Sequence, residues 1–184
     1  SFPQAICGGG IQFDLSSTQF DCGDLGDHQV TLTAHNSSLS QSCTATITVQ
    51  DQTAPTVNCK NATVCLGAGG TAAAGYPDVY QGGSDNCGTV NPQYISQTVF
   101  GCSHLGANVV TVTANDGHGN TATCNAVVTV VDNLAPTVNC KNVTVYLSAG
   151  GTAAAGYPDV YQGGSDNCGT VNPEYISQTV FGCS

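Results

Sequence analysis

The cysteines are the residues of this sequence with the clearest chemistry. The chain has eleven of them among 184 residues, and it has no methionine or tryptophan. A small chain so rich in cysteine forms disulfides and belongs to an oxidising compartment. No apolar run approaches the length of a membrane span. We therefore expect an extracellular protein, either secreted or held at a cell surface.

The charged residues argue against one class of partner. The chain has twelve acidic residues and only two basic ones, Lys60 and Lys141, so its formal net charge is −10. We do not expect nucleic acid as a partner, because no basic patch is available to neutralise phosphate. Charged residues make up only 8% of the chain. Hydroxyls, amides, attached sugar or neighbouring chains must therefore cover the surface.

Three sequons offer acceptors for sugar: Asn36-Ser-Ser38, Asn61-Ala-Thr63 and Asn142-Val-Thr144. The motif is short and also arises by chance, and these asparagines would equally well end a strand. The low charge favours covalent glycans. We therefore predict glycosylation at Asn36, Asn61 and Asn142.

Carboxylates near the ends of a repeat offer oxygen ligands for calcium. Asp116 lies in a hairpin turn, and Asp132 and Asn133 close the repeat. Oxygen-only ligands at a domain boundary suit this ion. However, Asp116-Gly117 is also a turn signal, and the loop has no repeated Asp-x-Asp ladder. We expect no resident metal or cofactor, with calcium at Asp116, Asp132 and Asn133 as the alternative; Asp78 and Asp85 are weaker candidates.

The histidines do not indicate an enzyme. His28, His35, His104 and His118 show no paired-ligand spacing, and the sequence has no Gly-x-Ser-x-Gly, phosphate-binding glycine loop or Cys-x-x-Cys. Cys102-Ser-His104 sets a thiol near a base, but the aligned residue in the first part of the chain is Asp24. We expect no catalytic residues.

An internal repeat organises the elements that carry these residues. Residues 54–103 return as residues 135–184, 81 positions further along, and the first 53 residues match the later part of the same period. The two copies differ at four positions: Ala62/Val143, Cys65/Tyr146, Gly67/Ser148 and Gln93/Glu174. We expect the rear part of a repeat at 1–53, a complete repeat at 54–134 and the front part of a repeat at 135–184.

A chain that begins and ends inside a repeat has two explanations. It is a segment of a longer polymer of domains, or the front part of one chain completes the rear part of another by strand exchange. Residues 1–22 and 163–184 occupy the same part of the period. Because joined chains would duplicate this segment, we favour the longer polymer.

Short β-rich runs separated by turn residues set the fold class. In the complete repeat they are residues 56–59, 62–66, 71–80, 94–100, 108–114 and 121–131, with a polar loop at 81–88. The last two runs are joined by Asn-Asp-Gly-His-Gly-Asn, which predicts a hairpin. No segment has the period, length and caps of a helix. We therefore predict an all-β chain of tandem immunoglobulin-like β-sandwich domains, stapled by disulfides and joined by short links at 51–55 and 132–136.

Four motifs follow one another in fixed order along the repeat. They are Ala-Pro-Thr-Val-Asn-Cys with Asn61-Ala-Thr-Val, Ser84-Asp-Asn-Cys-Gly, Phe100-Gly-Cys-Ser-His-Leu-Gly, and Val110-Thr-Val-Thr-Ala-Asn-Asp-Gly-His-Gly-Asn-Thr-Ala-Thr-Cys. Together they resemble the hyalin repeat (HYR) domain. The resemblance implies an immunoglobulin-like module of extracellular adhesive or matrix proteins, including tandem arrays of bacterial surface proteins, without catalytic activity. The first part departs most, since residues 1–6 lack the Ser-Asp-Asn before Cys7 and residues 35–41 replace the Asp-Gly turn.

Spacing suggests how the cysteines pair. Cys87 and Cys102 flank one strand and its loop, and the same spacing relates Cys7 to Cys22 and Cys168 to Cys183, so we expect three local disulfides. Cys59 lies in the opening strand and Cys124 in the closing strand. These strands are neighbours in immunoglobulin-like sandwiches, which predicts a long-range disulfide.

Three cysteines remain after this pairing. Cys43 and Cys140 then need partners outside the sequence. Cys65, whose counterpart is Tyr146, is either a buried free thiol or an interchain cross-link.

The expected function is structural: an extracellular fibre or stalk of tandem HYR-like domains, glycosylated, that serves reach, matrix formation or adhesion. Its partners are neighbouring repeats or identical protomers, and surface or matrix glycans. One alternative is a glycan- or protein-binding adhesin whose repeated loops, such as residues 81–88, act by avidity. Another is the accessory domain of a secreted enzyme.

Overall fold

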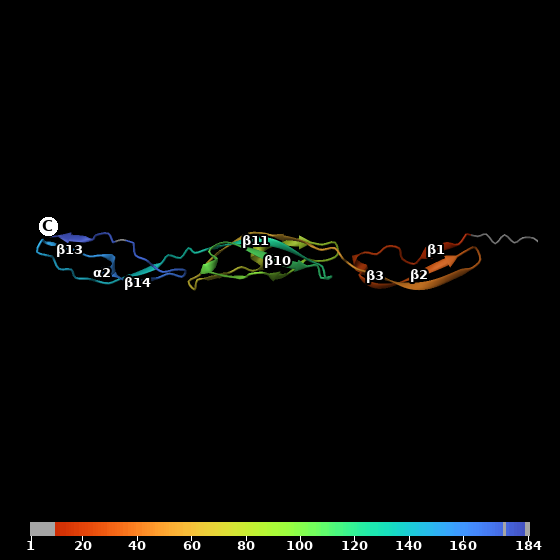
Figure 1. Ribbon diagram of the computed structural model, residues 1–184. Coiled ribbons are helices and arrows are strands. Elements are labelled where there is room, and N and C mark those ends of the chain that lie inside the picture. The colour runs from red at the N-terminus through yellow and green to blue at the C-terminus, as the bar shows by residue number, and fades with distance from the viewer. Residues whose placement is uncertain (1–9, 175, 183–184) are drawn as a thin grey trace, which may run out of the picture. The chain divides into compact units, whose positions relative to one another are not determined.

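The computed structural model describes residues 10–174 and 176–182 (Figure 1). The chain divides into two compact units. The first comprises the described residues up to Val57 together with Gly82–Gln93 and Thr113–Thr123. The second comprises Asn58–Gln81, Tyr94–Val112 and the described residues from Cys124 onward. The division therefore falls within the complete repeat, and the link at residues 51–55 lies inside the first unit.

The first unit contains an antiparallel sheet of three strands in the order β1-β2-β3. The strands are β1 (Gln12–Leu15), β2 (Gly26–His35) and β3 (Ser40–Val49). β2 and β3 form a hairpin in which Val30 lies opposite Ala45. The side chain of Asn36 holds the turn, because its Oδ1 accepts hydrogen bonds from the N–H groups of Ser38 (2.9 Å) and Leu39 (2.8 Å). A 3₁₀ turn, η1 (Cys22–Asp24), separates β1 from β2.

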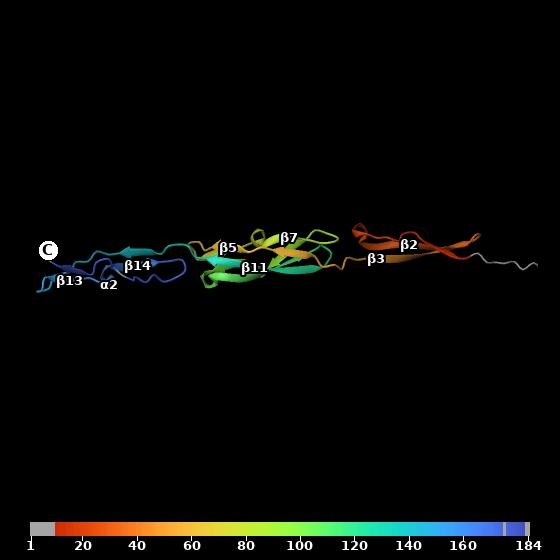
Figure 2. The same ribbon diagram turned by 90° about the horizontal axis from the view of Figure 1, so that it is seen from above.

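The complete repeat is built on a sheet of four strands in the order β5-β11-β10-β8. They are β5 (Ala62–Cys65), β8 (Asn91–Ile95), β10 (Gly106–Asn115) and β11 (Thr121–Val131). β5 runs parallel to β11, with Ala62 opposite Val128 (Figure 2). β10 and β11 form the predicted hairpin, and their buried residues alternate with partly exposed ones, as the period of a half-buried strand requires.

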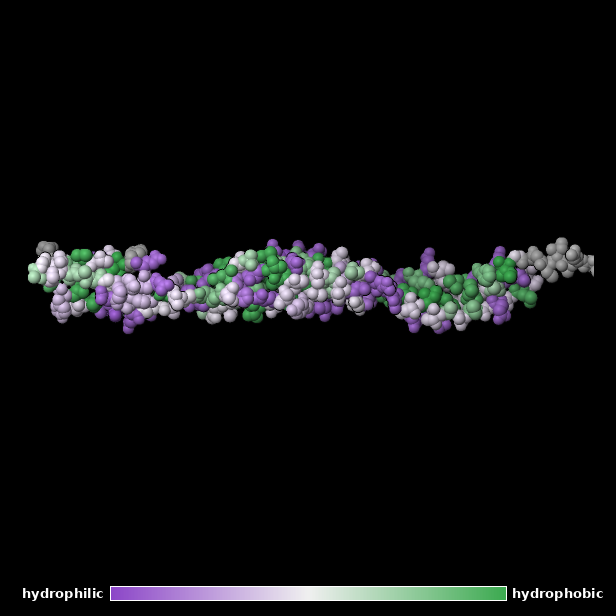
Figure 3. Space-filling model, viewed as in Figure 1, coloured by the Kyte–Doolittle hydropathy of each residue, from purple (hydrophilic) through white to green (hydrophobic). Residues whose placement is uncertain are grey.

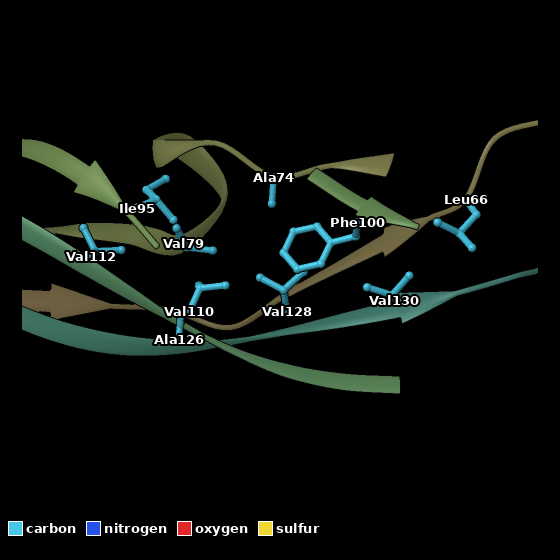
Figure 4. Close-up of a cluster of buried hydrophobic side chains, with 10 residues drawn as sticks. All are labelled: Leu66, Ala74, Val79, Ile95, Phe100, Val110, Val112, Ala126, Val128 and Val130. Atoms are coloured by element: carbon cyan, nitrogen blue, oxygen red, sulfur yellow. The ribbon is translucent and has the colours of Figure 1, made fainter. Parts of the chain in front are cut away.

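A second layer covers this sheet. It consists of two strand pairs, β4 (Thr56–Cys59) with β7 (Tyr80–Ser84) and β6 (Thr71–Ala73) with β9 (Val99–Gly101). The core between the layers contains Leu66, Ala74, Val79, Ile95, Phe100, Val110, Val112, Ala126, Val128 and Val130 (Figure 4). Phe100 is fully buried. The complete repeat is thus an immunoglobulin-like β-sandwich, and the all-β fold class predicted from the sequence is confirmed.

Two details of the prediction are wrong. Residues 94–100 do not form one strand, because β8 joins the sheet of β10 whereas β9 joins β6 in the other layer. The predicted strand at 71–80 contains a single helical turn, α1 (Tyr76–Val79). Pro77 fixes a helical φ there, and the Asp78 carboxylate accepts a hydrogen bond from the Gly75 N–H at 2.7 Å.

The third part of the chain repeats the second layer. β12 (Thr137–Cys140) pairs with β14 (Tyr161–Ser165), and β13 (Thr152–Ala154) pairs with β15 (Val180–Gly182). The helical turn recurs as α2 (Tyr157–Val160). Residues 141–148, which contain the counterpart of β5, are not in a strand. This part has the layer that covers a sheet, but the described residues of this part contain no counterpart of the sheet β5-β11-β10-β8.

Candidate functional site

The junctions between successive repeats carry disulfides. Cys22 of the first part bonds to Cys87 of the complete repeat, and Cys102 of the complete repeat bonds to Cys168 of the third part. Cys22 aligns with Cys102, and Cys87 aligns with Cys168. The two disulfides therefore join equivalent positions of successive repeats. The Cα atoms are 5.1 Å apart in the first pair and 5.2 Å in the second.

The predicted local pairing of Cys87 with Cys102 is therefore wrong. Strands β8 and β9 lie between these cysteines and carry the chain away from Cys87, so the two thiols do not meet. The same finding excludes the predicted bonds of Cys22 with Cys7 and of Cys168 with Cys183. Cys7 and Cys183 themselves lie outside the described residues.

The long-range pairing is as predicted. Cys59 of β4 bonds to Cys124 of β11, with a Cα–Cα distance of 5.7 Å. This bond joins the two layers of the sandwich. Cys43 and Cys140, which align with Cys124 and Cys59, are free and exposed.

Cys65 is also a free and exposed thiol, so of the two alternatives predicted for it, the buried free thiol is wrong. It is the last residue of β5, and its Sγ lies 3.7 Å from the Nδ2 of Asn133. β5 borders the sheet and has a partner on one side only, which leaves this residue at the edge.

The first junction is held by polar contacts around its disulfide. The Asp85 Oδ2 accepts a hydrogen bond from the Cys87 N–H at 2.9 Å, and the Asn86 Nδ2 donates to the Asp51 Oδ1 at 3.3 Å. The Nε2 of His118 lies 2.9 Å from the carbonyl oxygen of Cys87. These contacts bring the loop after β7, the link after β3 and the hairpin turn together within the first unit.

Asp116, in that hairpin turn, is the one buried charged residue among those described, with 2% of its surface exposed. Its Oδ1 accepts hydrogen bonds from the backbone N–H groups of His118 (2.7 Å) and Asn120 (3.1 Å). The Asn120 side chain donates to its Oδ2 at 2.6 Å. Burial alone would raise the pKa of the Asp116 carboxyl. The hydrogen bonds outweigh burial, so the pKa lies below its ordinary value of 3.8.

Three carboxylates meet at this junction. One oxygen of each of Asp51, Asp85 and Asp116 lies within 4.8 Å of the others. The Asp51 Oδ2 and the Asp85 Oδ1 are buried and have no hydrogen-bond partner. Buried ionised oxygens without a partner are costly, and like charges at this distance repel one another. A cation would satisfy both oxygens and cancel the repulsion.

The second junction repeats two of the polar contacts of the first. The Asn167 Nδ2 donates to the Asp132 Oδ1 at 3.0 Å, as Asn86 does to Asp51, and the Cys168 N–H donates to the Asp166 Oδ2 at 3.1 Å, as Cys87 does to Asp85. The Asp166 Oδ1 is again buried without a partner. Of the two orphaned oxygens of the first junction, the Asp85 Oδ1 thus recurs as the Asp166 Oδ1, whereas Asp132, the counterpart of Asp51, has no orphaned oxygen.

The predicted calcium ligands are not brought together. Asp116 belongs to the first unit, whereas Asp132 and Asn133 belong to the second. Asp116 occupies the closed end of the β10–β11 hairpin, and Asp132 follows its open end, so eleven residues of β11 separate them. Asp116 instead meets Asp51, which is the counterpart of Asp132 one repeat earlier, and Asp85. Asn133 contacts Cys65.

The four histidines each take part in a local contact. His28 packs on Phe20 and His104 on Phe100, both with ring centroids 5.9 Å apart. His35 lies 2.7 Å from the Asp14 carboxylate. Cys102, suggested as a thiol beside His104, is bonded to Cys168. The prediction that the chain is not an enzyme stays a prediction.

The sequon asparagines are all exposed. Asn36 lies in the β2–β3 turn, where its Oδ1 is engaged as described above. The Asn61 Oδ1 accepts a hydrogen bond from the Val127 N–H at 2.8 Å. Asn142 lies in the segment without strand structure.

No family model and no curated protein matches this chain. Among solved structures it is similar to a protocadherin gammaB7 EC3-6 cis-dimer, at 16% identity and a TM-score of 0.36, over 77% of this chain and 46% of that one. It is also similar to human protocadherin-24 EC1-2, at 10% identity and a TM-score of 0.34, over 67% and 83% of the two chains. A glycoside hydrolase family 107 endo-fucoidan hydrolase matches at 17% identity and a TM-score of 0.26, over 69% and 24%.

The chain thus spans less than half of the protocadherin gammaB7 structure. All three TM-scores lie below 0.5. Across the part of the chain that the structure describes, no helix is long and apolar enough to span a membrane.

Proposed function

We propose that this chain is a structural component of an extracellular fibre or stalk, built from tandem repeats that resemble the HYR domain. The observation that carries the proposal is the disulfide between successive repeats, Cys22–Cys87, which recurs as Cys102–Cys168. A bond that recurs at each junction extends to an array of any length. It fastens repeats that would otherwise be joined by a short peptide link alone.

These bonds contribute stability as well as connection. Each closes a loop of 65 or 66 residues. Loop-entropy estimates give up to about 4 kcal/mol for a loop of this size, and measured disulfides typically give 2–4 kcal/mol. Such bonds form in oxidising surroundings, which supports an extracellular location. The low charge and the exposure of Asn36, Asn61 and Asn142 support a glycan coat.

We include calcium in this proposal, bound at the junction by Asp51, Asp85 and Asp116. The donor set is oxygen only and carries three negative charges, which suits a hard divalent cation. The unpartnered Asp51 Oδ2 and Asp85 Oδ1 are the atoms that would contact the ion. Bound calcium would stiffen the same junction that the disulfide closes.

A binding module is the alternative function, but its candidate loop, residues 81–88, already makes contacts within the chain. Cys87 is bonded to Cys22, and Asp85 belongs to the carboxylate cluster. A Cβ at Gly88 would lie 2.6 Å from the Asp116 carbonyl oxygen, so this position is packed against the hairpin turn. These contacts favour a structural role for residues 81–88. A glycan array that showed specific, loop-dependent binding would support the adhesin instead.

A disulfide map and micrographs test the structural proposal. A protease that cleaves before aspartate releases residues 21–23, 85–115 and 166–184 as separate peptides. Without reduction, the proposal expects these three peptides joined into one species. Local pairing would leave residues 85–115 free and internally bonded. Longer arrays of the repeat should form threads whose length grows with repeat number; compact particles would contradict the proposal.

Calcium titration tests the metal site. Calcium should raise the unfolding temperature of the wild-type chain, with a Kd of roughly 10⁻⁴–10⁻³ M, as is usual for extracellular modules. Asp85→Asn should abolish this response. It should also stabilise the calcium-free protein, because it relieves carboxylate repulsion. Glu174→Gln, which introduces the residue found at Gln93, is the control and should respond like wild type. An unchanged titration in Asp85→Asn would exclude this site.

A further inference from the structure

The outer face of the sheet in the complete repeat, which points away from the core, carries small apolar side chains. The Thr111 Oγ1 donates a hydrogen bond to the Asn125 Oδ1 at 2.9 Å, so these two residues are cross-strand neighbours on this face. Two residues further along each strand of the antiparallel hairpin, Val109 lies opposite Val127. Val109 is 68% exposed, and Val127 is partly exposed.

The apolar surface continues from β11 to the edge strand β5. Val131 lies opposite Cys65 in the parallel pairing of these strands. Both point outward, because Val130 points into the core and successive residues of a strand point to opposite faces. We call this set the Val109 patch: Cys65, Ala107, Val109, Val127 and Val131. In Figure 3, hydrophobic residues come to the surface in the middle part of the chain, where Figure 1 labels β10 and β11.

The hairpin itself does not require this patch. β2 and β3 of the first part form the same hairpin with polar residues at the equivalent places. Gln29 stands in place of Val109, and its Nε2 donates a hydrogen bond to the Thr46 Oγ1 at 2.8 Å. Thr46 in turn stands in place of Val127. The apolar residues of the complete repeat are therefore explained by something that contacts them.

Charge indicates which partner suits the patch. The chain has a net charge of −10, so two copies repel each other wherever acidic surfaces meet. The Val109 patch has no charged residue, whereas the equivalent face of the first part carries Asp27 in place of Ala107. The patch also contains an exposed thiol that has no disulfide partner, Cys65. A second copy of the patch offers an apolar surface, no repulsion and a second thiol.

The patch alone is too small to hold two copies together. Three strands about 4.8 Å apart and five residues about 3.4 Å apart span roughly 14 by 17 Å, or about 250 Å². Stable complexes bury about 800 Å² on each partner. A covalent bond must therefore supply most of the stability of such a contact, and Cys65 is placed to form one.

We propose that the Val109 patch is an interface between two copies of this chain, closed by a disulfide between their Cys65 residues. The contact is isologous, so each copy uses the same surface. A two-fold axis that passes through Cys65 and Val109 sets each of these residues against its own copy. Because this axis runs diagonally across β5, β11 and β10, the two sheets cross at a steep angle, as in orthogonal sheet packing.

The disulfide forms by oxidation of the two thiols. Two S–H bonds break and one S–S bond forms. Two protons and two electrons pass to a small-molecule disulfide such as oxidised glutathione, which becomes two thiols. This inference goes beyond the proposed function, since a fibre joined within one chain needs no contact between chains. Paired patches would join two such fibres side by side.

The first test asks whether Cys65 joins two copies. It uses the full chain without glycans, because a glycan on Asn61 at the start of β5 would lie beside the patch. Cysteines 7, 43, 140 and 183 are replaced by serine, so Cys65 is the one cysteine outside the three disulfides. In a glutathione redox buffer, non-reducing gels should show a covalent dimer and nothing larger. Cys65→Ser should remain monomeric.

The second test separates a docking surface from a thiol that is merely reactive. In the same background, Val109→Asp should lower the ratio of dimer to glutathione-capped monomer at least about tenfold, because it buries a charge against its own copy. Val109→Gln should also lower the ratio, and it introduces the residue that the equivalent hairpin carries at Gln29. Gln29→Asp adds the same charge outside the patch, so it is the matched control and should leave the ratio unchanged.

Three results would overturn the proposal. The first is a background chain that stays monomeric, and the second is a dimer that persists in Cys65→Ser. The third is a ratio that Val109→Asp leaves unchanged or that Gln29→Asp lowers equally. None of these results involves the Cys22–Cys87 disulfide within a chain, whose peptide map tests the proposed function separately.

Discussion

The complete repeat and the first part of the chain contain the same strand hairpin in two surroundings. In the complete repeat the core-facing residues of β10 and β11 are buried beneath a second layer. In the first part Val30 on the equivalent face of β2 and β3 is buried, but Leu32 and Ala45 are exposed, although the pairing of the two strands is intact. Backbone pairing and core formation are therefore separable here. The hairpin sequence is sufficient for backbone pairing, whereas burial of the core-facing residues requires the covering layer.

The third part shows the converse. Residues 62–65 form β5 beside β11, whereas residues 143–146 form no strand. The second stretch is Val-Thr-Val-Tyr and has the higher β propensity, with Val143 for Ala62 and Tyr146 for Cys65. Residues 143–146 lack a strand like β11 to pair with. Strand formation at this position therefore depends on the partner strand, as expected because β propensity depends on context.

The largest expected difference between the two surroundings is at the buried phenylalanine. Phe100→Ala should lower the free energy of unfolding by roughly 3–5 kcal/mol, because it leaves a cavity in a packed core. Phe20→Ala, at the counterpart, should cost much less because that side chain is partly exposed. Chemical denaturation of both variants measures the difference, and equal losses would show that the first part has a core after all.

The next effect is at the disulfide between layers. Replacing both Cys59 and Cys124 by alanine should cost about 2–4 kcal/mol, since this bond closes a loop of 65 residues. Cys43→Ala, at a free counterpart, should leave the monomer unchanged. Thermal unfolding under non-reducing conditions checks both. A destabilised Cys43→Ala monomer would mean that this thiol already has a partner within the chain.

A smaller effect is expected at the sequon asparagines. Asn61→Ala should cost about 1 kcal/mol, because the Val127 N–H loses its acceptor at the start of the β5–β11 pairing. Asn142→Ala should cost nothing measurable in the unglycosylated protein, since this residue lies outside any strand. Hydrogen exchange at the β11 amides reports the first change. Equal costs would indicate that residues 141–148 do pair in solution.

The smallest expected effect is a difference in acid response between the two hairpin turns. The folded-state pKa of Asp116 is lowered, so its contribution to stability is complete above the ordinary pKa of 3.8 and is lost as pH falls below that value. The turn at Asn36 is held by a neutral amide and should not respond. The protection of the His118 and Asn120 amides from hydrogen exchange should fall in this pH range, while the protection of the Ser38 and Leu39 amides should stay constant. Asp116→Asn should remove the contrast.

Most of the fold could be predicted from the sequence because its signals are local. The alternation of valine and threonine around an Asp-Gly turn predicted the β10–β11 hairpin, and the positions of Cys59 and Cys124 in opening and closing strands predicted their bond. Residues 94–100 were misassigned because a strand that changes layers has no clean alternation. Pro77 and Asp78 carried the signal of a helical turn, but four residues are too few for periodicity to reveal.

The junction could not be predicted because it is assembled from residues far apart in the sequence. Pairing Cys22 with Cys87 requires knowing which end of a repeat each one occupies, and spacing along the chain does not contain that information. Asp51 and Asp85 were missed as partners of Asp116 for the same reason. One signal was available, since Asp51 returns as Asp132 and Asp85 as Asp166 in the same register as the cysteines.

The recurring disulfide also sets how such a chain would respond to tension. Between Cys22 and Cys168 the shortest covalent route crosses from Cys22 to Cys87, follows the backbone to Cys102 and crosses again to Cys168. Residues 23–86 and 103–167 form loops that are closed by these disulfides and lie off this route. A pulling force would therefore not extend these residues while the disulfides are intact. Reduction would release that hidden length, and the molecule would change from nearly inextensible to compliant.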